Sequence, residues 1–168
     1  IPKLSEDIKF YEENNNKSYR EYRTRANEAV QKLLVANIVE KVSREELTCI
    51  NPLSLATNSK LKKRLCIDLS RKYNGLSQSK KFRIESTREA LQVIRRGDWM
   101  FSFDLKSAYL MIPVHPRFTR YLGFVVEEDD GSRMYYKYLM LPFGLNDAAR
   151  VLTRVMKLPI DRWRQQGI

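Results

Sequence analysis

The sequence predicts an α+β fold in which helices pack on an antiparallel sheet. Apolar residues recur at helical spacing over residues 18–41, alternate as in a strand over 99–105, and form a hairpin-like pattern over 121–141. The chain has 168 residues, of which 43% are hydrophobic, so it is long enough to bury a core and too apolar to be a disordered tail.

The first half of the chain predicts one helix and one hairpin after an N-terminal extension of residues 1–17. Residues 18–41 carry apolar side chains three and four positions apart, which is typical of an amphipathic helix. Two short strand-like runs follow at 50–56 and 64–69, separated by the lysine-rich NSKLKK. This pattern predicts a hairpin with a basic tip.

The next segment predicts a capped helix and a strand. Ser86 followed by Glu89 forms a capping box, which places a helix at about 87–96. The run WMFSFDL at 99–105 alternates aromatic residues with other residues, which predicts a strand. Asp104 then lies on the face opposite the aromatic rings, near the end of that strand.

The last part of the chain predicts a hairpin and a long helix. Residues 121–141 contain two strand-like runs joined by a turn at Asp130–Gly131. The final helix is expected to begin near Asn146 or Asp147. Pro159 is expected to kink or interrupt it.

Composition excludes several classes of protein. Two cysteines, Cys49 and Cys66, do not make a disulfide framework, and with His115 as the only histidine the usual zinc cluster has too few ligands. No run approaches the eighteen or so apolar residues of a membrane span, so no membrane partner is expected. The sequence favours an intracellular location and leaves nucleus and cytoplasm open.

Basic residues are concentrated in one segment. The formal net charge is +11, and residues Lys60 to Arg96 include twelve Lys and Arg against three Asp and Glu, a net +9. A solvated surface would account for any single lysine here. The cluster as a whole favours binding to phosphates, because displacing their counterions requires such local charge density.

Three segments together resemble reverse transcriptases, the RNA-directed DNA polymerases. FDLKSAY at 103–109 resembles their motif A, LMLPFGLNDAAR at 139–150 resembles motif B, and RLCIDLSRKYN at 64–74 resembles a fingers motif. With the opening helix, the matches keep the family's order over about residues 28–168. They look most like retroelement enzymes, particularly the tyrosine-recombinase retrotransposons of the DIRS group.

The resemblance implies a truncated right-hand polymerase. Residues 18–98 would be the fingers-side region, with the N-terminal helix and the basic hairpin, and residues 99–168 a partial palm carrying motifs A and B. Polymerases of this family transfer nucleotides with two Mg²⁺ ions. Asp104 matches the first metal-binding carboxylate, and the backbone carbonyl of Leu105 would join it.

The resemblance also assigns nucleotide-binding residues. Tyr109 matches the aromatic gate that favours a dNTP over a ribonucleotide by steric exclusion. Arg64 matches the arginine that clamps the triphosphate, where a planar guanidinium suits phosphate oxygens. Phe143 would lie beside the sugar, and Gly144 would let the backbone approach closely. The companion lysine is left open among Lys60, Lys62 and Lys63, and the last two are included with the nucleotide-binding residues.

An RNA template and a DNA primer are the other implied partners. The residues expected to bind them are basic: Lys60, Arg71, Lys72, Lys80, Lys81 and Arg150. One position departs from the family pattern, because Ala149 stands where motif B usually has a proline.

Motif C, the Tyr-x-Asp-Asp hairpin that supplies two further carboxylates, does not occur in these residues. We therefore expect this segment alone not to polymerise, and its partners to include the remaining palm and thumb of a longer polypeptide. The alternative is a catalytically silent module, derived from a reverse transcriptase, that binds nucleic acid or a protein.

Overall fold

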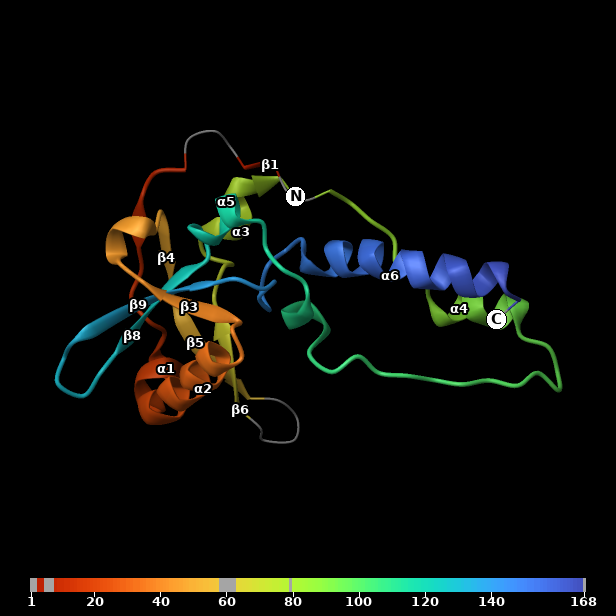
Figure 1. Cartoon of the computed structure of the whole chain (residues 1–168), viewed down its shortest axis with the longest axis horizontal. Coiled ribbons are helices and arrows are strands. Elements are labelled where there is room, and N and C mark those ends of the chain that lie inside the picture. The colour runs from red at the N-terminus through yellow and green to blue at the C-terminus, as the bar shows by residue number, and fades with distance from the viewer. Residues whose placement is uncertain (1–2, 5–7, 58–62, 79, 168) are drawn as a thin grey trace.

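The computed structural model describes residues 3–4, 8–57, 63–78 and 80–167, which form a mixed arrangement of helices and strands (Figure 1). The helices are α1 (Lys17–Glu21), α2 (Arg23–Val35), η1 (Arg44–Glu46), α3 (Tyr73–Leu76), α4 (Thr87–Val93), η2 (Ala108–Met111), α5 (Pro116–Thr119) and α6 (Ala148–Gln165). The strands are β1 (Lys3–Leu4), β2 (Tyr11–Glu12), β3 (Val39–Val42), β4 (Cys49–Asn51), β5 (Leu53–Thr57), β6 (Lys63–Ile67), β7 (Ser77–Gln78), β8 (Gly123–Glu127) and β9 (Arg133–Tyr138). The α+β class is confirmed.

The main sheet is mixed, which corrects the expectation of an antiparallel sheet. Within the described residues it has five strands in the order β2-β4-β8-β9-β3. β4 runs parallel to both β2 and β8, and β9 runs antiparallel to both β8 and β3. The parallel pairs join segments far apart in the sequence, an arrangement that strand periodicity does not encode. The sheet takes strands from each of the regions 1–17, 18–98 and 99–168.

The predicted helix over 18–41 is shorter than expected and divides into α1 and α2 at Tyr22. It ends where Asn37 adopts a left-handed backbone conformation, with φ of 53°. The chain then extends as β3, whose Val39 pairs with Tyr138 of β9. Pairing in the sheet therefore overrides the helical pattern at the end of this segment.

The predicted basic hairpin is confirmed as the antiparallel pair β5–β6, in register from Leu53 opposite Ile67 to Thr57 opposite Lys63. Its tip, residues 58–62, lies outside the described residues. Pro52 separates β5 from β4, so the strand expected over 50–56 is two strands that belong to different sheets. Proline has no backbone N–H to continue a strand ladder.

The strand predicted over 99–105 is wrong. The segment has no regular structure and joins α4 to η2 as a long connection (Figure 1). Trp99 is fully exposed, and Phe101 is 69% exposed. Phe103 contacts the Trp163 ring of α6 edge-on, with ring centroids 5.5 Å apart. Alternation describes a preference for extended backbone, but a strand also needs a neighbour to hydrogen-bond with, and none of the described strands is adjacent.

The hairpin predicted over 121–141 is confirmed as β8–β9, and Gly131 in its turn has φ of 84°. The last helix, α6, begins after Asp147 as predicted and continues through Pro159 without interruption. Val155, whose carbonyl would otherwise accept the N–H that proline lacks, is 45% exposed, so water can donate to that carbonyl instead. Among the described residues, no helix has the length and apolar character needed to cross a lipid bilayer.

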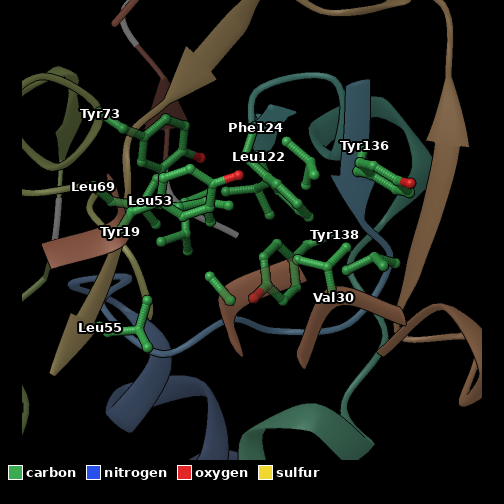
Figure 2. Packing of buried hydrophobic residues seen from close by; sticks show 14 residues of the cluster. Tyr19, Val30, Leu53, Leu55, Leu69, Tyr73, Leu122, Phe124, Tyr136 and Tyr138 are labelled. Carbon is green, nitrogen blue, oxygen red and sulfur yellow. The ribbon is translucent and has the colours of Figure 1, made fainter. Parts of the chain in front are cut away.

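The core lies between the main sheet, the helices α1 and α2, and the β5–β6 hairpin (Figure 2). Tyr19, Val30 and Phe124 are fully buried in it. The Tyr19 hydroxyl donates to the Asn27 side chain and accepts from the backbone N–H of Glu127, so this buried polar group is satisfied. Because the cluster joins the hairpin to the sheet, it fixes β6 relative to the segment that precedes α6.

Candidate functional site

The segments that resemble the fingers motif, motif A and motif B meet at one place. Tyr109 on η2 and Phe143 before α6 lie edge to face, with ring centroids 5.2 Å apart and ring planes at 78°. Phe143 is 39% exposed, and Tyr109 is partly exposed. The two residues that the resemblance assigns to the nucleotide sugar are therefore in contact, and both are partly exposed to solvent.

Gly144 brings the same loop against β6. Its φ is 98°, a left-handed conformation that favours glycine. A Cβ atom at this position would lie 2.8 Å from the backbone carbonyl oxygen of Ile67. Gly144 was expected to let the backbone approach a template or nucleotide closely. In this structure it approaches β6, the strand that also carries Arg64.

A hydrogen-bond network of asparagines fixes this contact. The Asn74 amide donates to the Gly144 carbonyl at 2.8 Å, and the Asn146 backbone N–H donates to Asn74 Oδ1 at 3.1 Å. The Asn146 amide also donates to the Asn74 carbonyl and to Ser77 Oγ. The sequence pointed to Asn146 only as a possible start of the final helix, and it assigned no role to the Asn74 side chain. Local sequence does not reveal the tertiary partner of an amide.

The triphosphate residues are only partly described. Arg64 is exposed on β6, in register with Ala56 of β5 and three residues before Ile67. Lys60 and Lys62 lie outside the described residues. The backbone of Lys63 belongs to β6, while its side chain lies outside the described part of the chain.

Asp104 and Leu105 lie on the connection between α4 and η2. Asp104 is exposed, and Leu105 is 39% exposed. Among the described residues, no three His, Cys, Asp or Glu side chains come close enough together to hold a metal ion. One carboxylate and one carbonyl are a small part of a six-coordinate Mg²⁺ shell. The described residues alone therefore do not form a magnesium site, and we derive no catalytic step through the metal.

The residues expected to bind nucleic acid fall into two groups. Lys80 and Lys81 are exposed on the loop before α4. Arg71 and Lys72 are about half-exposed and form ion pairs with Glu13, with nitrogen–oxygen distances of 3.8 and 3.1 Å. These two residues therefore also hold the N-terminal segment against the start of α3.

Arg150 is in a different environment. It is 9% exposed, and its Nε donates to Asp147 Oδ1 at 2.5 Å, with a second contact from Nη2 to the other carboxylate oxygen. This hydrogen bonding raises the pKa of Arg150. The guanidinium is thus engaged at the first turn of α6, and we leave it out of the proposed interface.

Asp68 connects β6 to the N-terminal segment. It accepts hydrogen bonds from Ser70 Oγ at 2.6 Å and from the Asn16 amide at 3.1 Å. Partial burial alone would raise the pKa of this carboxyl. The hydrogen bonds from Ser70 and Asn16 and the charge of Arg71 outweigh that effect, and the net pKa is lowered.

Neither a scan against models of protein families nor a search of curated proteins finds a match to this chain. The resemblance to reverse transcriptases is therefore carried by residues 64–74, 103–109 and 139–150 themselves.

Proposed function

We propose that this chain is the fingers and amino-terminal palm part of an RNA-directed DNA polymerase. In this proposal it holds an RNA template, a DNA primer and an incoming dNTP. Tyr109 and Phe143 contact the sugar, and Arg64 with a hairpin lysine contacts the triphosphate. The exposed lysines Lys80 and Lys81 contact the nucleic-acid backbone.

The observation that carries this proposal is the convergence of three separate sequence segments. The Tyr109 ring packs on the Phe143 ring, and the next residue, Gly144, approaches Ile67 of β6, the strand that also carries Arg64. A chance resemblance in scattered segments would not require them to be adjacent. Two partly exposed aromatic rings, with an exposed arginine on the strand that Gly144 approaches, suit a nucleotide, which combines a sugar and a planar base with an anionic triphosphate.

The proposed Mg²⁺ ions would be held by Asp104, the Leu105 carbonyl, the nucleotide phosphates and the motif C carboxylates of a longer polypeptide. When bound, the metal would activate the primer hydroxyl and stabilise the leaving pyrophosphate. This chain would contribute by positioning the sugar and the triphosphate.

A second candidate is a catalytically silent nucleic-acid-binding module. Asp104 is exposed and, within the part of the chain that the structure describes, belongs to no group of three or more possible metal-ligating side chains. This favours such a module, because the module needs the basic surface and no assembled metal site. The two candidates differ in whether a dNTP matters for binding.

The first test is the salt dependence of hybrid binding by the 168-residue chain. Affinity for a fluorescent RNA–DNA primer–template would be measured from 50 to 300 mM salt, for the native chain and for Lys62→Glu/Lys63→Glu/Arg64→Glu. We expect the variant to bind about tenfold or more weakly at low salt and with a shallower salt slope, because fewer phosphates are neutralised.

A matched control carries the same charge change at exposed residues of α2 and β3, namely Arg25→Glu/Lys32→Glu/Lys41→Glu. It should bind more tightly than the hairpin variant. Equal affinity of the two variants would mean that net charge alone holds the nucleic acid, and the proposed interface would be wrong.

A further inference from the structure

The connection between α4 and η2 is exposed along its whole length. Every residue from 94 to 107 is exposed, and the connection runs outside the main sheet in Figure 1. Among the described residues, the backbone groups of 99–106 take part in no hydrogen bond. Backbone groups that are exposed in this way can pair with a strand from another chain.

The aromatic side chains of this segment lie on one side of its backbone. The rings of Phe101 and Phe103 stack, with centroids 6.4 Å apart and planes at 23°. In an extended chain, Trp99 belongs to the same side. The three side chains are 101%, 69% and 55% exposed for Trp99, Phe101 and Phe103. At roughly 150–250 Å² for each full side chain, they present about 450 Å² of surface, as much as the largest apolar patch of a typical monomer.

The order of these residues is complementary to a second copy of the same segment. When two copies pair antiparallel with Ser102 at the centre, Phe101 of one copy lies opposite Phe103 of the other. Trp99 then lies opposite Leu105. The aromatic residues of both copies share one face of the two-stranded ribbon, and the two halves of the interface are identical, as twofold symmetry requires.

The same register also matches charges at both ends of the ribbon. Asp98 of each copy lies opposite Lys106 of the other, and both residues are exposed. Cross-strand pairs of opposite charge are stabilising, while like charges opposite each other are destabilising. A shift of one residue would separate these charges and put the aromatic rings of the two copies on opposite faces. Apolar pattern and charge therefore select one alignment.

The size of the surface fits a dimer of this kind. Two copies bring together about 900 Å² of exposed aromatic surface, and the backbone of the two paired strands adds to it. Specific, stable interfaces begin at about 1,200 Å² in total. The ribbon lies near this limit, so we expect a dissociation constant in the micromolar range.

We infer that residues 98–106 are a dimer interface, in which two copies of this chain pair these segments as antiparallel strands centred on Ser102. The inference is independent of the polymerase proposal, because it requires neither nucleic acid nor a metal ion.

The first test is sedimentation equilibrium of the 168-residue chain from about 1 to 200 µM. We expect a monomer–dimer equilibrium with a Kd of about 10 µM. Phe101→Lys should raise this Kd about tenfold or more, because it places a charge among the aromatic rings. Leu158→Lys is the matched control, since Leu158 lies on α6 outside the segment and is 76% exposed. A chain that is monomeric at the highest concentration, or that forms aggregates without a dimer, would overturn the inference.

The register is tested by exchanging the paired charges. Lys106→Asp and Asp98→Lys should each weaken the dimer about tenfold, because each puts like charges opposite each other at both ends. The double variant Asp98→Lys/Lys106→Asp should recover most of the native affinity. Lys32→Asp, at an exposed lysine of α2, controls for the change in net charge. If the double variant dimerises no more tightly than either single variant, the proposed alignment is wrong.

Amide hydrogen exchange locates the interface in the native chain. The amides of residues 99–106 should become protected as the chain concentration rises through the Kd, while those of the exposed loop at 80–85 should not change. Protection of 99–106 that is the same at all concentrations would mean that the segment pairs within its own chain, which would contradict a dimer interface.

Discussion

At the scale of single residues, Gly144 combines a positive φ with a close approach to the backbone of another strand. Its positive φ and the 2.8 Å that would separate a Cβ atom from the Ile67 carbonyl leave no room for a side chain. Because the clash is with backbone, the neighbouring strand would have to move. The reverse-transcriptase motif B that this segment resembles has a glycine here, and in this chain the immediate physical reason is packing against β6.

We predict that Gly144→Ala lowers the free energy of unfolding by about 1–3 kcal/mol, through strain and the displaced strand. Urea unfolding followed by circular dichroism would measure it. Gly97→Ala serves as a control, since Gly97 also has positive φ but has open space where its Cβ would be. An alanine at 144 that costs no more than one at 97 would contradict the close approach.

Asp68 provides a second prediction at this scale. Its pKa is lower in the folded chain than in the unfolded chain, so its ionised form stabilises the fold. This contribution is complete above the unfolded carboxyl pKa of about 3.9 and is lost as the pH falls through the lower folded value. The stability difference between the native chain and Asp68→Asn should be constant from pH 7 to 5 and shrink below pH 4. A difference that persists unchanged to pH 2.5 would argue against it.

At the scale of elements, the connection between α3 and α6 depends on two asparagines. Asn74 and Asn146 exchange hydrogen bonds through both side chains and both backbones, and Asn74 also holds the Gly144 carbonyl. Two segments far apart in the chain are thereby held together next to Phe143, which directly precedes Gly144.

We predict that Asn74→Ala and Asn146→Ala are not additive. A double-mutant cycle in urea unfolding should give a coupling of about 1 kcal/mol. The two side chains make different hydrogen bonds, but both sets hold the same two segments together, so the second substitution costs less once the first has loosened them. The control cycle pairs Asn74→Ala with Asn27→Ala, whose side chain binds the backbone of Glu127 elsewhere in the molecule. Additivity of the Asn74–Asn146 pair within about 0.3 kcal/mol would show that the network does not join the two segments.

Local patterns in the sequence predicted the elements that depend on local interactions. The β5–β6 and β8–β9 hairpins follow from their turn residues. The start of α6 lies at Asp147 as predicted, although the Asp147 carboxylate binds Arg150 and makes no capping hydrogen bond. The parallel pairing of β4 with β8 did not follow, because it joins segments without a local signal. The prediction of a strand over 99–105 was wrong for a related reason, because alternation of residue types does not show whether a neighbouring strand is present.

The candidate site shows the same division. Motif resemblance selected Tyr109, Phe143 and Gly144, which the fold brings together. The asparagine network was missed, because an amide's partners depend on tertiary structure. Arg150 was expected to bind nucleic acid, but it forms an ion pair with Asp147. Asp147 lies three residues earlier, and side chains at this spacing on a helix are neighbours.

At the scale of the whole molecule, the basic segment 60–96 and the candidate site share β6, which Gly144 approaches. Residues 60–96 carry most of the net charge of +11, and they include β6, α3 and α4. α4 lies beside the far end of α6 (Figure 1), where Glu85 pairs with Arg164 at 2.6 Å. A nucleic acid held by the loop before α4 and by β6 would therefore pass the Tyr109–Phe143 pair.

The central claim is that this surface recognises a primer–template together with its next nucleotide. The most direct measurement is the affinity of the chain for an RNA–DNA primer–template with Mg²⁺ and each of the four dNTPs. We predict that the dNTP complementary to the templating base tightens binding more than the other three and more than the matching ribonucleotide. Tyr109→Ala should reduce the preference over the ribonucleotide. Equal effects of all four dNTPs, or no effect of any, would contradict the polymerase assignment and favour the silent nucleic-acid-binding module.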